Sequence, residues 1–302
     1  LTDKIDDYMK DGGLLTREDL SNYEVIERTP LKTDFNGKTI ITNPMPSPGG
    51  TLIAFALKII SQKFPGEKID NRLLTLGMRL AQIARSEIIS AKNRENSLSE
   101  ILSPSYFKRY LDLFDYEISL KLNKEKPGSG STTHMSIIDS QGNAASVTTT
   151  NGEGCGYIIP GTGIMMNNML GEDDLNPYGF HNWETTKRMS TMMSPTIVIG
   201  DSGPELVLGS GGSNRIRSAI KQVIINKFTN NMNLEEAIKA PRIHLEENII
   251  HCEPGINTDE LDFPWSTINR WHEKNLFFGG VNAVTPTNAV GDTRRSGYGL
   301  VY

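Results

Sequence analysis

Apolar side chains fall at helical spacing in the first part of the chain. In residues 71–96 they recur three or four positions apart, which predicts an amphipathic helix. Residues 51–64 are largely apolar and follow a proline-rich turn at 43–50, so they predict a second and more buried helix. Apart from a short strand at 38–42, we expect the first 120 residues to be mainly helical.

The second part of the chain has the alternation and composition that are typical of strands. Residues 124–131 are polar and rich in Gly, Ser and Pro, which indicates a linker. Strands are predicted at 133–139, 144–151, 163–167, 196–200 and 205–209. Helices are predicted at 214–228 and, behind a capping asparagine, at 233–237. Strands between helical layers indicate a layered α/β (α+β) arrangement.

The first two of these strands are joined by a tight turn, so they are expected to form a hairpin. Gly142 and Asn143 lie in the turn, and we expect both to supply left-handed backbone positions. A three-residue loop places Thr132 opposite Thr150, whereas a two-residue loop places it opposite Asn151, which is also a candidate substrate-binding residue. Either register brings a second polar side chain beside Thr132.

Thr132 opens the hairpin directly after the linker, and it is the candidate nucleophile. A neighbouring hydroxyl such as that of Thr150 could hold its Oγ in a reactive orientation. A free α-amino group has a pKa of about 7.7–8 and can accept the hydroxyl proton, so an N-terminal threonine supplies both nucleophile and base. The hypothesis therefore requires cleavage between Ser131 and Thr132. The same pattern also fits a strand that simply begins behind an exposed linker.

A glycine-rich loop at 209–214 connects a buried strand to a helix. Glycines leave backbone N–H groups unobstructed, and a helix N-terminus adds about half a positive charge, so the loop is suited to a developing oxyanion. Gly211, Gly212 and Ser213 are the candidate donors. The same features suit a phosphate, but no Gly-Lys-Ser/Thr signature follows. A plain strand-to-helix turn is the alternative.

Composition and charge argue against several classes of function. The 302 residues carry a net charge of −5 with scattered Lys and Arg, which argues against a nucleic-acid surface. No apolar run reaches the ~20 residues that span a bilayer. Cys155 and Cys252 fit neither a disulfide framework nor a cysteine zinc site, and the five histidines lack metal-ligand spacing. We expect no metal and no cofactor, and we expect His134 to be a hydrogen-bonded core residue.

Several segments, taken together and in order, resemble the γ-glutamyltransferase family of N-terminal-nucleophile hydrolases. They cover nearly the whole chain. These segments are residues 12–20, 46–50, 132–136 with Asp139 and 142–143, 193–198, 209–212 and 240–242. The resemblance implies a four-layer αββα sandwich.

The resemblance also implies roles for individual residues. By matching position, Thr132 would be the nucleophile, Thr150 its supporting hydroxyl, and the backbone of Gly211, Gly212 and Ser213 the oxyanion hole. Attack on a γ-glutamyl amide, as in a glutathione-like donor, would give an acyl-enzyme. Water would then complete hydrolysis, or an amino acid or peptide would complete transfer.

Cleavage before Thr132 would divide the chain into two associated subunits. Residues 1–131 resemble the C-terminal part of the large subunit, whose N-terminal part would lie outside this sequence. Residues 132–302 resemble the small catalytic subunit, and the two are expected to form one intertwined domain. A homodimer is compatible with this organisation. The sequence begins at Leu1 without signal-peptide features, and it leaves the compartment open.

The recognition residues depart from the family pattern. Gly152 stands where the family has an Asn that holds the α-amino group of the substrate. Glu172 and Asp173 are the nearby acids, and we hypothesise that one of them reaches this ammonium. Thr191 and Met192 replace a pair of serines that helps to hold the α-carboxylate. The catalytic residues are thus closer to the family pattern than the residues for γ-glutamyl recognition.

Two other functions remain open from the sequence. The first is an acylase of the same fold with a different acyl specificity, such as a glutaryl side chain. The second is a non-catalytic homologue that serves as a binding or scaffold protein. A chain that stays uncut would favour the second.

Overall fold

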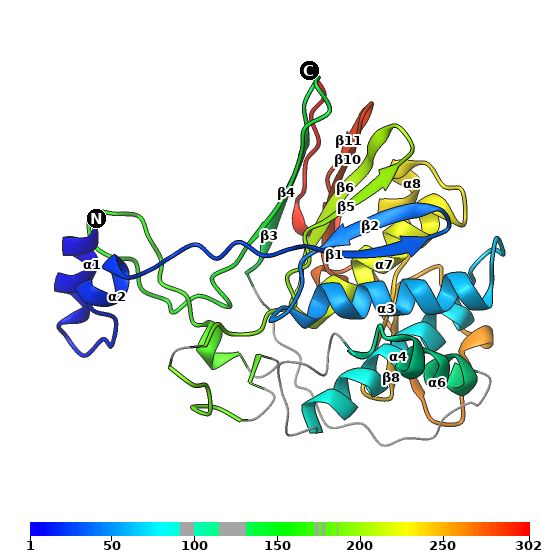
Figure 1. Ribbon diagram of the computed structural model, residues 1–302, viewed down its shortest axis with the longest axis horizontal. Helices are drawn as coiled ribbons and strands as arrows, with labels where there is room; N and C mark the ends of the chain where they lie inside the picture. Colours follow the sequence, from blue (N-terminus) through cyan, green and yellow to red (C-terminus); the bar gives the residue numbers. More distant parts are fainter. Residues whose placement is uncertain (91–99, 115–130, 173–174, 177–178, 186) are drawn as a thin grey trace.

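A body of helices and sheets carries a separate N-terminal arm (Figure 1). The computed structural model describes residues 1–90, 100–114, 131–172, 175–176, 179–185 and 187–302. The arm holds helices α1 (Thr2–Met9) and α2 (Arg17–Ser21), and an extended segment joins it to the body. No helix within these residues is long and apolar enough to cross a membrane.

A six-stranded antiparallel sheet lies at the centre of the body, in the order β1-β2-β5-β6-β10-β11. Its strands are β1 (Leu31–Phe35), β2 (Lys38–Thr42), β5 (Thr196–Gly200), β6 (Gly203–Gly211), β10 (Gly280–Thr285) and β11 (Asn288–Val290). Strand β2 pairs with β5 from Thr39↔Ile199 to Thr42↔Thr196. Strands that precede and follow Thr132 therefore belong to one sheet.

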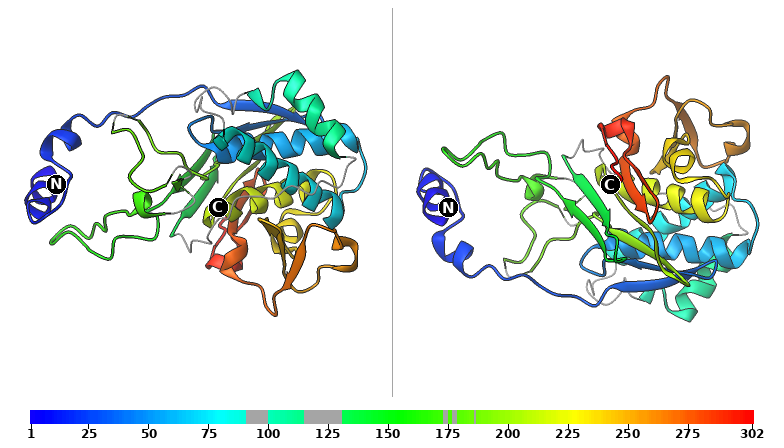
Figure 2. Two further views of the ribbon diagram at one scale, coloured as in Figure 1. Left: turned by 90° about the horizontal axis from the view of Figure 1, so that it is seen from below. Right: turned by 90° about the horizontal axis from the view of Figure 1, so that it is seen from above.

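Helices cover one face of this sheet (Figure 2). They are α3 (Pro48–Lys63), α4 (Asn71–Ser90), α6 (Pro104–Phe114), α7 (Ile216–Phe228) and α8 (Leu234–Lys239). Helix α3 is apolar around most of its circumference and is buried from Pro48 to Leu57, as expected for a helix enclosed on several sides. It shares a core with α7 and the sheet, and a second core with α4 and α6.

The opposite face of the sheet carries a hairpin of β3 (Thr133–Ile138) and β4 (Ala144–Thr149). Its inward side chains are mostly polar. Its outward face includes Met135, Ile137 and Val147, which are 54%, 57% and 42% exposed. Helices, sheet and hairpin form three successive layers of the predicted sandwich, and within the described ranges no helix packs against the outward face of the hairpin. The α+β class is confirmed.

A smaller three-stranded sheet completes the helical side. It consists of β7 (Ile243–Glu246), β8 (Ile249–Cys252) and β9 (Thr267–Arg270). Short 3₁₀ turns η1 (Met169–Gly171), η3 (Ser213–Arg215), η4 (Asp259–Leu261), η5 (Leu276–Phe278) and η6 (Thr293–Arg295) lie between the main elements. The sequence predicted neither this sheet nor β1, β10 and β11.

Most predicted elements are confirmed, with shifted ends. The strands at 38–42 and 196–200 match to the residue. Helix α3 starts earlier than predicted because Pro48 suits the first helical position. Helix α4 is described to Ser90, and the predicted continuation to 96 lies outside the described residues, as do residues 124–130 of the linker.

Two local predictions are wrong. Residues 163–167 form no strand, and only Met165 makes an isolated bridge, to Ile158. Gly163 has a positive φ of 71°, which turns the chain out of an extended path. In the hairpin turn, Gly142 has the expected positive φ of 84° but Asn143 does not; its side chain donates to Asp139 instead.

Candidate active site

The hairpin register brings Thr132 to Thr150. Thr133 pairs with Thr149, which is the register of the three-residue loop. Thr132 Oγ1 donates to Thr150 Oγ1 at 3.0 Å, and the N–H of Gly152 donates to the same Thr150 oxygen at 3.0 Å. Thr150 Oγ1 thus accepts two hydrogen bonds. This arrangement orients the candidate nucleophile before any substrate arrives.

The glycines of β6 let the hairpin approach the central sheet. A Cβ on Gly211 would lie 2.2 Å from the Thr132 carbonyl oxygen, and a Cβ on Gly209 would lie 2.3 Å from the His134 ring. Gly212 has a φ of +125°, and a Cβ there would lie 2.9 Å from Gly279 Cα. The predicted glycine loop therefore lies directly beside Thr132. Larger residues at positions 209 and 211 would displace the hairpin.

Ser213 follows these glycines at the start of η3. It is buried, and its φ of +50° is a left-handed value that few non-glycine residues adopt. Such backbone values often occur at functional sites. Of the three predicted oxyanion-hole residues, Gly211 lies against Thr132, and Gly212 lies against Gly279. That their backbone N–H groups form an oxyanion hole stays a prediction.

His134 is a structural residue, as the sequence predicted. Its Nδ1 lies 2.8 Å from Thr148 Oγ1 and its Nε2 lies 2.8 Å from Ser136 Oγ. Burial lowers the pKa of His134 to about 4, so the ring is neutral near pH 7. Because hydroxyl groups occupy both ring nitrogens, His134 does not serve as the base for Thr132.

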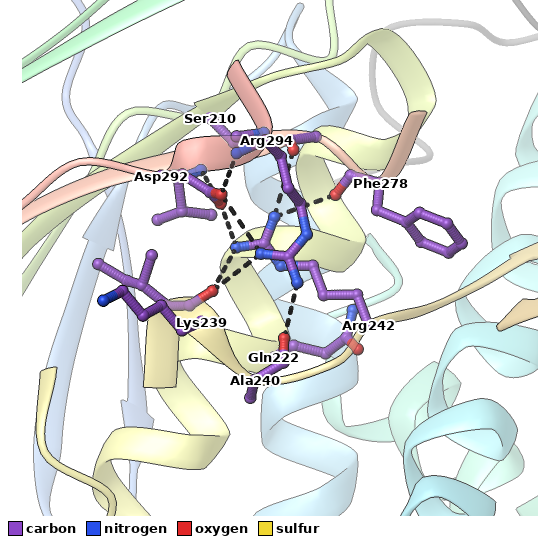
Figure 3. A network of polar contacts seen from close by, with 12 residues as sticks. Ser210, Gln222, Lys239, Ala240, Arg242, Phe278, Asp292 and Arg294 are labelled. Carbon is purple, nitrogen blue, oxygen red and sulfur yellow. Dashed lines mark hydrogen bonds and ion pairs between the residues drawn. The ribbon is translucent and has the colours of Figure 1, made fainter. Parts of the chain in front are cut away.

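A buried network of charges lies behind the glycine loop (Figure 3). Arg242 Nη2 contacts Asp292 Oδ2 at 2.6 Å, and Arg294 Nη2 contacts Glu253 Oε2 at 2.5 Å. Arg294 also contacts Asp292 Oδ1 at 3.3 Å. Burial opposes ionisation of Asp292, but the two guanidinium groups and two backbone N–H groups outweigh it and hold the Asp292 pKa below its usual value.

This charge network fixes the backbone that supports the glycine loop. Arg242 Nη1 donates to the carbonyls of Phe278 (3.2 Å) and Gly279 (3.3 Å), and Asp292 accepts from Val281 N at 3.0 Å. The next contact reaches the loop, because Gly280 N donates to Ser210 Oγ at 3.1 Å. Sequence reasoning missed this network. Of its residues, the family resemblance had singled out only Arg242, in the segment 240–242, and it implied no role for this residue.

Glu172 lies beside the turn that follows Thr150. A Cβ on Gly152 would lie 2.5 Å from Glu172 Oε1, so the missing side chain at Gly152 leaves room for this carboxylate. Asp173, the other acid of the hypothesis, lies outside the described residues. Asn151 is exposed, and its carbonyl accepts from Gly154 N at 2.9 Å. Of the predicted recognition residues, Glu172 has a carboxylate close to the turn of Thr150 and Gly152.

Thr191 and Met192 lie on the segment before β5. The Thr191 carbonyl accepts from Ser47 Oγ at 2.7 Å. Met192 packs into the large core. Thr191 also lines a cavity of about 550 Å³ with Arg28 and Arg188, but neither Thr132 nor Thr150 belongs to its lining. That these two residues contact a substrate stays a prediction.

Acidic and metal-ligating side chains are dispersed in the parts of the chain that the structure describes. There, no group of three or more His, Cys, Asp or Glu residues is placed to hold a metal ion.

Comparison with known proteins points to one family. A family model described as Gamma-glutamyltranspeptidase matches residues 1–302. The chain is 31% identical to a glutathione hydrolase proenzyme from Escherichia coli, over 83% of this chain and 48% of the relative. It is 30% identical to an Acylase ACY 1 proenzyme from a Pseudomonas species, over 92% of this chain and 52% of the relative. It spans about half the length of these relatives.

A solved structure shows the same fold. The cephalosporin acylase from Bacillus halodurans superimposes with a TM-score of 0.79 at 20% identity, and the match covers all of this chain and 58% of the acylase. The helical layer, the central sheet and the hairpin thus belong to a known sandwich architecture.

Proposed function

Because the chain belongs to the gamma-glutamyltranspeptidase family of N-terminal-nucleophile hydrolases, we propose that it cuts itself before Thr132 and that the freed Thr132 is the nucleophile of an amidase or acyl transferase. The contact between Thr132 Oγ1 and Thr150 Oγ1 carries this proposal. The glycine loop beside Thr132 supports it.

The self-cleavage step first converts the Ser131–Thr132 amide into an ester and a free Thr132 amine, and it then hydrolyses the ester. Thr132 Oγ1 attacks the Ser131 carbonyl carbon, the new C–O bond forms, and the C–N bond to Thr132 breaks. The proton of Oγ1 passes to the Thr132 nitrogen. This transfer frees the Thr132 amino group. Water then hydrolyses the ester, which leaves a carboxylate on Ser131 and restores the Thr132 hydroxyl.

Turnover of a substrate repeats this chemistry with the new amino group as base. The amine takes the Oγ1 proton while Oγ1 attacks the amide of the acyl donor. Backbone N–H groups of Gly211, Gly212 and Ser213 stabilise the negative charge on the carbonyl oxygen. The C–N bond of the donor amide then breaks, and the leaving amine departs with the proton that the Thr132 amine had taken. Water, an amino acid or a peptide finally takes the acyl group from Thr132 Oγ1, which regains its proton.

A γ-glutamyl donor is the first candidate, and Glu172 is the residue proposed to recognise it. The carboxylate of Glu172 reaches the turn of Thr150 and Gly152, where an acid could pair with the α-ammonium of the substrate. Asn151, Asp173, Thr191 and Met192 remain proposed contacts.

An acylase with another acyl specificity is the second candidate, because Gly152 removes a side chain that the family uses for the ammonium. Hydrolysis rates of γ-glutamyl and glutaryl anilides separate the two, since only the first anilide carries an α-amino group. Faster turnover of the glutaryl compound would favour the acylase.

The decisive experiment is the mass, under denaturing conditions, of the full-length protein and of two variants. We expect two fragments in the wild type, the smaller beginning at Thr132, and one uncut chain in Thr132→Ala. Thr133→Ala is the matched control and should be cut normally, because Thr133 is exposed on the outward face of β3. A wild-type chain that stays uncut would overturn the mechanism and favour the scaffold function.

A further inference from the structure

Ser131, the residue before the proposed cut, is fixed by the turn that follows β4. Its N–H donates to the Gly152 carbonyl at 2.5 Å, and its Oγ donates to the same oxygen at 2.8 Å. Two donors of one residue on one acceptor restrain both its backbone and its χ1. Ser131 is therefore held in a defined orientation although it ends a linker-like segment.

Gly152 also holds the residue on the other side of the bond. Its N–H donates to Thr150 Oγ1, which accepts from Thr132 Oγ1. Gly152 thus contacts Ser131 through its carbonyl and Thr132 through its N–H and the Thr150 hydroxyl. Both residues that flank the Ser131–Thr132 bond are tied to one glycine.

The turn itself is fixed by a neighbouring segment. Gly152 has a φ of +65°, and a Cβ there would lie 2.6 Å from Asn168 Oδ1. Asn168 Oδ1 accepts from Glu153 N at 2.7 Å, and Asn168 N donates to the Asn151 carbonyl at 3.1 Å. Asn168 therefore braces the turn on both sides of Gly152.

We infer that Ser131 is a positioning residue for self-cleavage. Its two hydrogen bonds to the Gly152 carbonyl restrict the orientations of the Ser131–Thr132 peptide, so that Thr132 Oγ1 attacks from a narrow set of geometries. The inference rests on the proposed function, because it requires that the chain is cut before Thr132. The Ser131 hydroxyl keeps its proton and stays bound to Gly152, so Ser131 acts through geometry and takes no part in bond making.

The rate of cleavage of newly made full-length precursor tests this role. We expect Ser131→Ala, which keeps the N–H bond and loses the hydroxyl bond, to slow cleavage roughly 2- to 12-fold. Ser131→Thr retains the hydroxyl and should cut at close to the wild-type rate. Ser140→Ala is the matched control, since Ser140 is exposed at the far end of the hairpin. Fragments are followed over time on denaturing gels.

Folding is checked separately in the uncleavable Thr132→Ala background, with and without Ser131→Ala, by thermal unfolding. If Ser131→Ala impairs folding in this background, the cleavage rate is measured for Ser131→Cys instead, because a thiol is a weaker hydrogen-bond donor to the Gly152 carbonyl. If Ser131→Ala is cleaved at the wild-type rate, or if Ser131→Thr is cleaved as slowly as Ser131→Ala, the positioning role is overturned while the proposed function stands. An uncut wild type would overturn the proposed function and this inference together.

Discussion

Thr132 lies between two regions of very different construction. On the glycine side, which comprises residues 209–213 with β10 and the charge network behind them, every residue is buried or half-buried. On the loop side, residues 151–172, many side chains are exposed, including Tyr157 at 66% and Leu170 at 61%. We expect most substitutions on the glycine side to be destabilising, because its residues are packed in the interior. We expect substitutions on the loop side to cost little stability because many of its side chains are exposed.

Removal of a charge from the network should have the largest effect. Asp292→Ala leaves Arg242 and Arg294 buried without one of their anionic partners, and we expect a loss of about 3–5 kcal/mol in the free energy of unfolding. Glu172→Ala, the loop-side control, should change it by about 0.5 kcal/mol or less. Urea unfolding of both variants measures the contrast. Similar losses in both would remove the distinction between the two regions.

Acid should weaken the hairpin contact with the glycine side. The His134 pKa is about 4 in the folded state and about 6.5 when unfolded, so the unfolded chain binds the extra proton between these values. Stability from His134 is complete above pH 6.5 and falls by about 3 kcal/mol as the pH drops to 4. Denaturant unfolding across this range should show a shallower decline in His134→Gln. Parallel curves for the two proteins would contradict this assignment.

Two glycines with positive φ offer a matched comparison. Gly212→Ala adds left-handed strain and a contact of 2.9 Å with Gly279 Cα, and we expect a loss of about 2–3 kcal/mol. Gly156 on the loop side has a φ of +82° and open space around its Cα. Gly156→Ala should therefore cost only about 1 kcal/mol of strain. Thermal unfolding compares them, and equal losses would show that crowding at Gly212 is unimportant.

The smallest effect on stability, with a change in specificity, is expected for Glu172→Gln. If this carboxylate pairs with a substrate ammonium, the KM for a γ-glutamyl anilide should rise about tenfold, which corresponds to about 1.4 kcal/mol. The KM for a glutaryl anilide should stay the same because that compound lacks the ammonium. Unchanged discrimination between the two anilides would remove Glu172 from recognition.

Local sequence signals predicted the part of the site that depends on the hairpin. Strand alternation and a glycine turn restrict the register to two choices, and the structure selects the one that pairs Thr132 with Thr150. The glycine loop was predicted for the same reason, because a strand, glycines and a helix follow one another along the chain. These features are set by residues that are neighbours in sequence.

The charge network could not be predicted in this way. Arg242 and Asp292 are 50 positions apart, and charged residues in a sequence usually indicate an exposed surface. Only the folded chain shows that they are buried together. The strand predicted at 163–167 failed for a different reason: it rested on a short apolar run, and the positive φ of Gly163 turns the chain out of an extended path.

The pairing of β2 with β5 has a further consequence for refolding. Because these strands lie on opposite sides of Thr132 in one sheet, an uncut chain forms the sheet within a single molecule. After a cut, the same sheet has to be assembled from two molecules. Recovery from denaturant should then depend on protein concentration for the cut form and not for the uncut form, so that one broken peptide bond changes folding from a first-order to a second-order process.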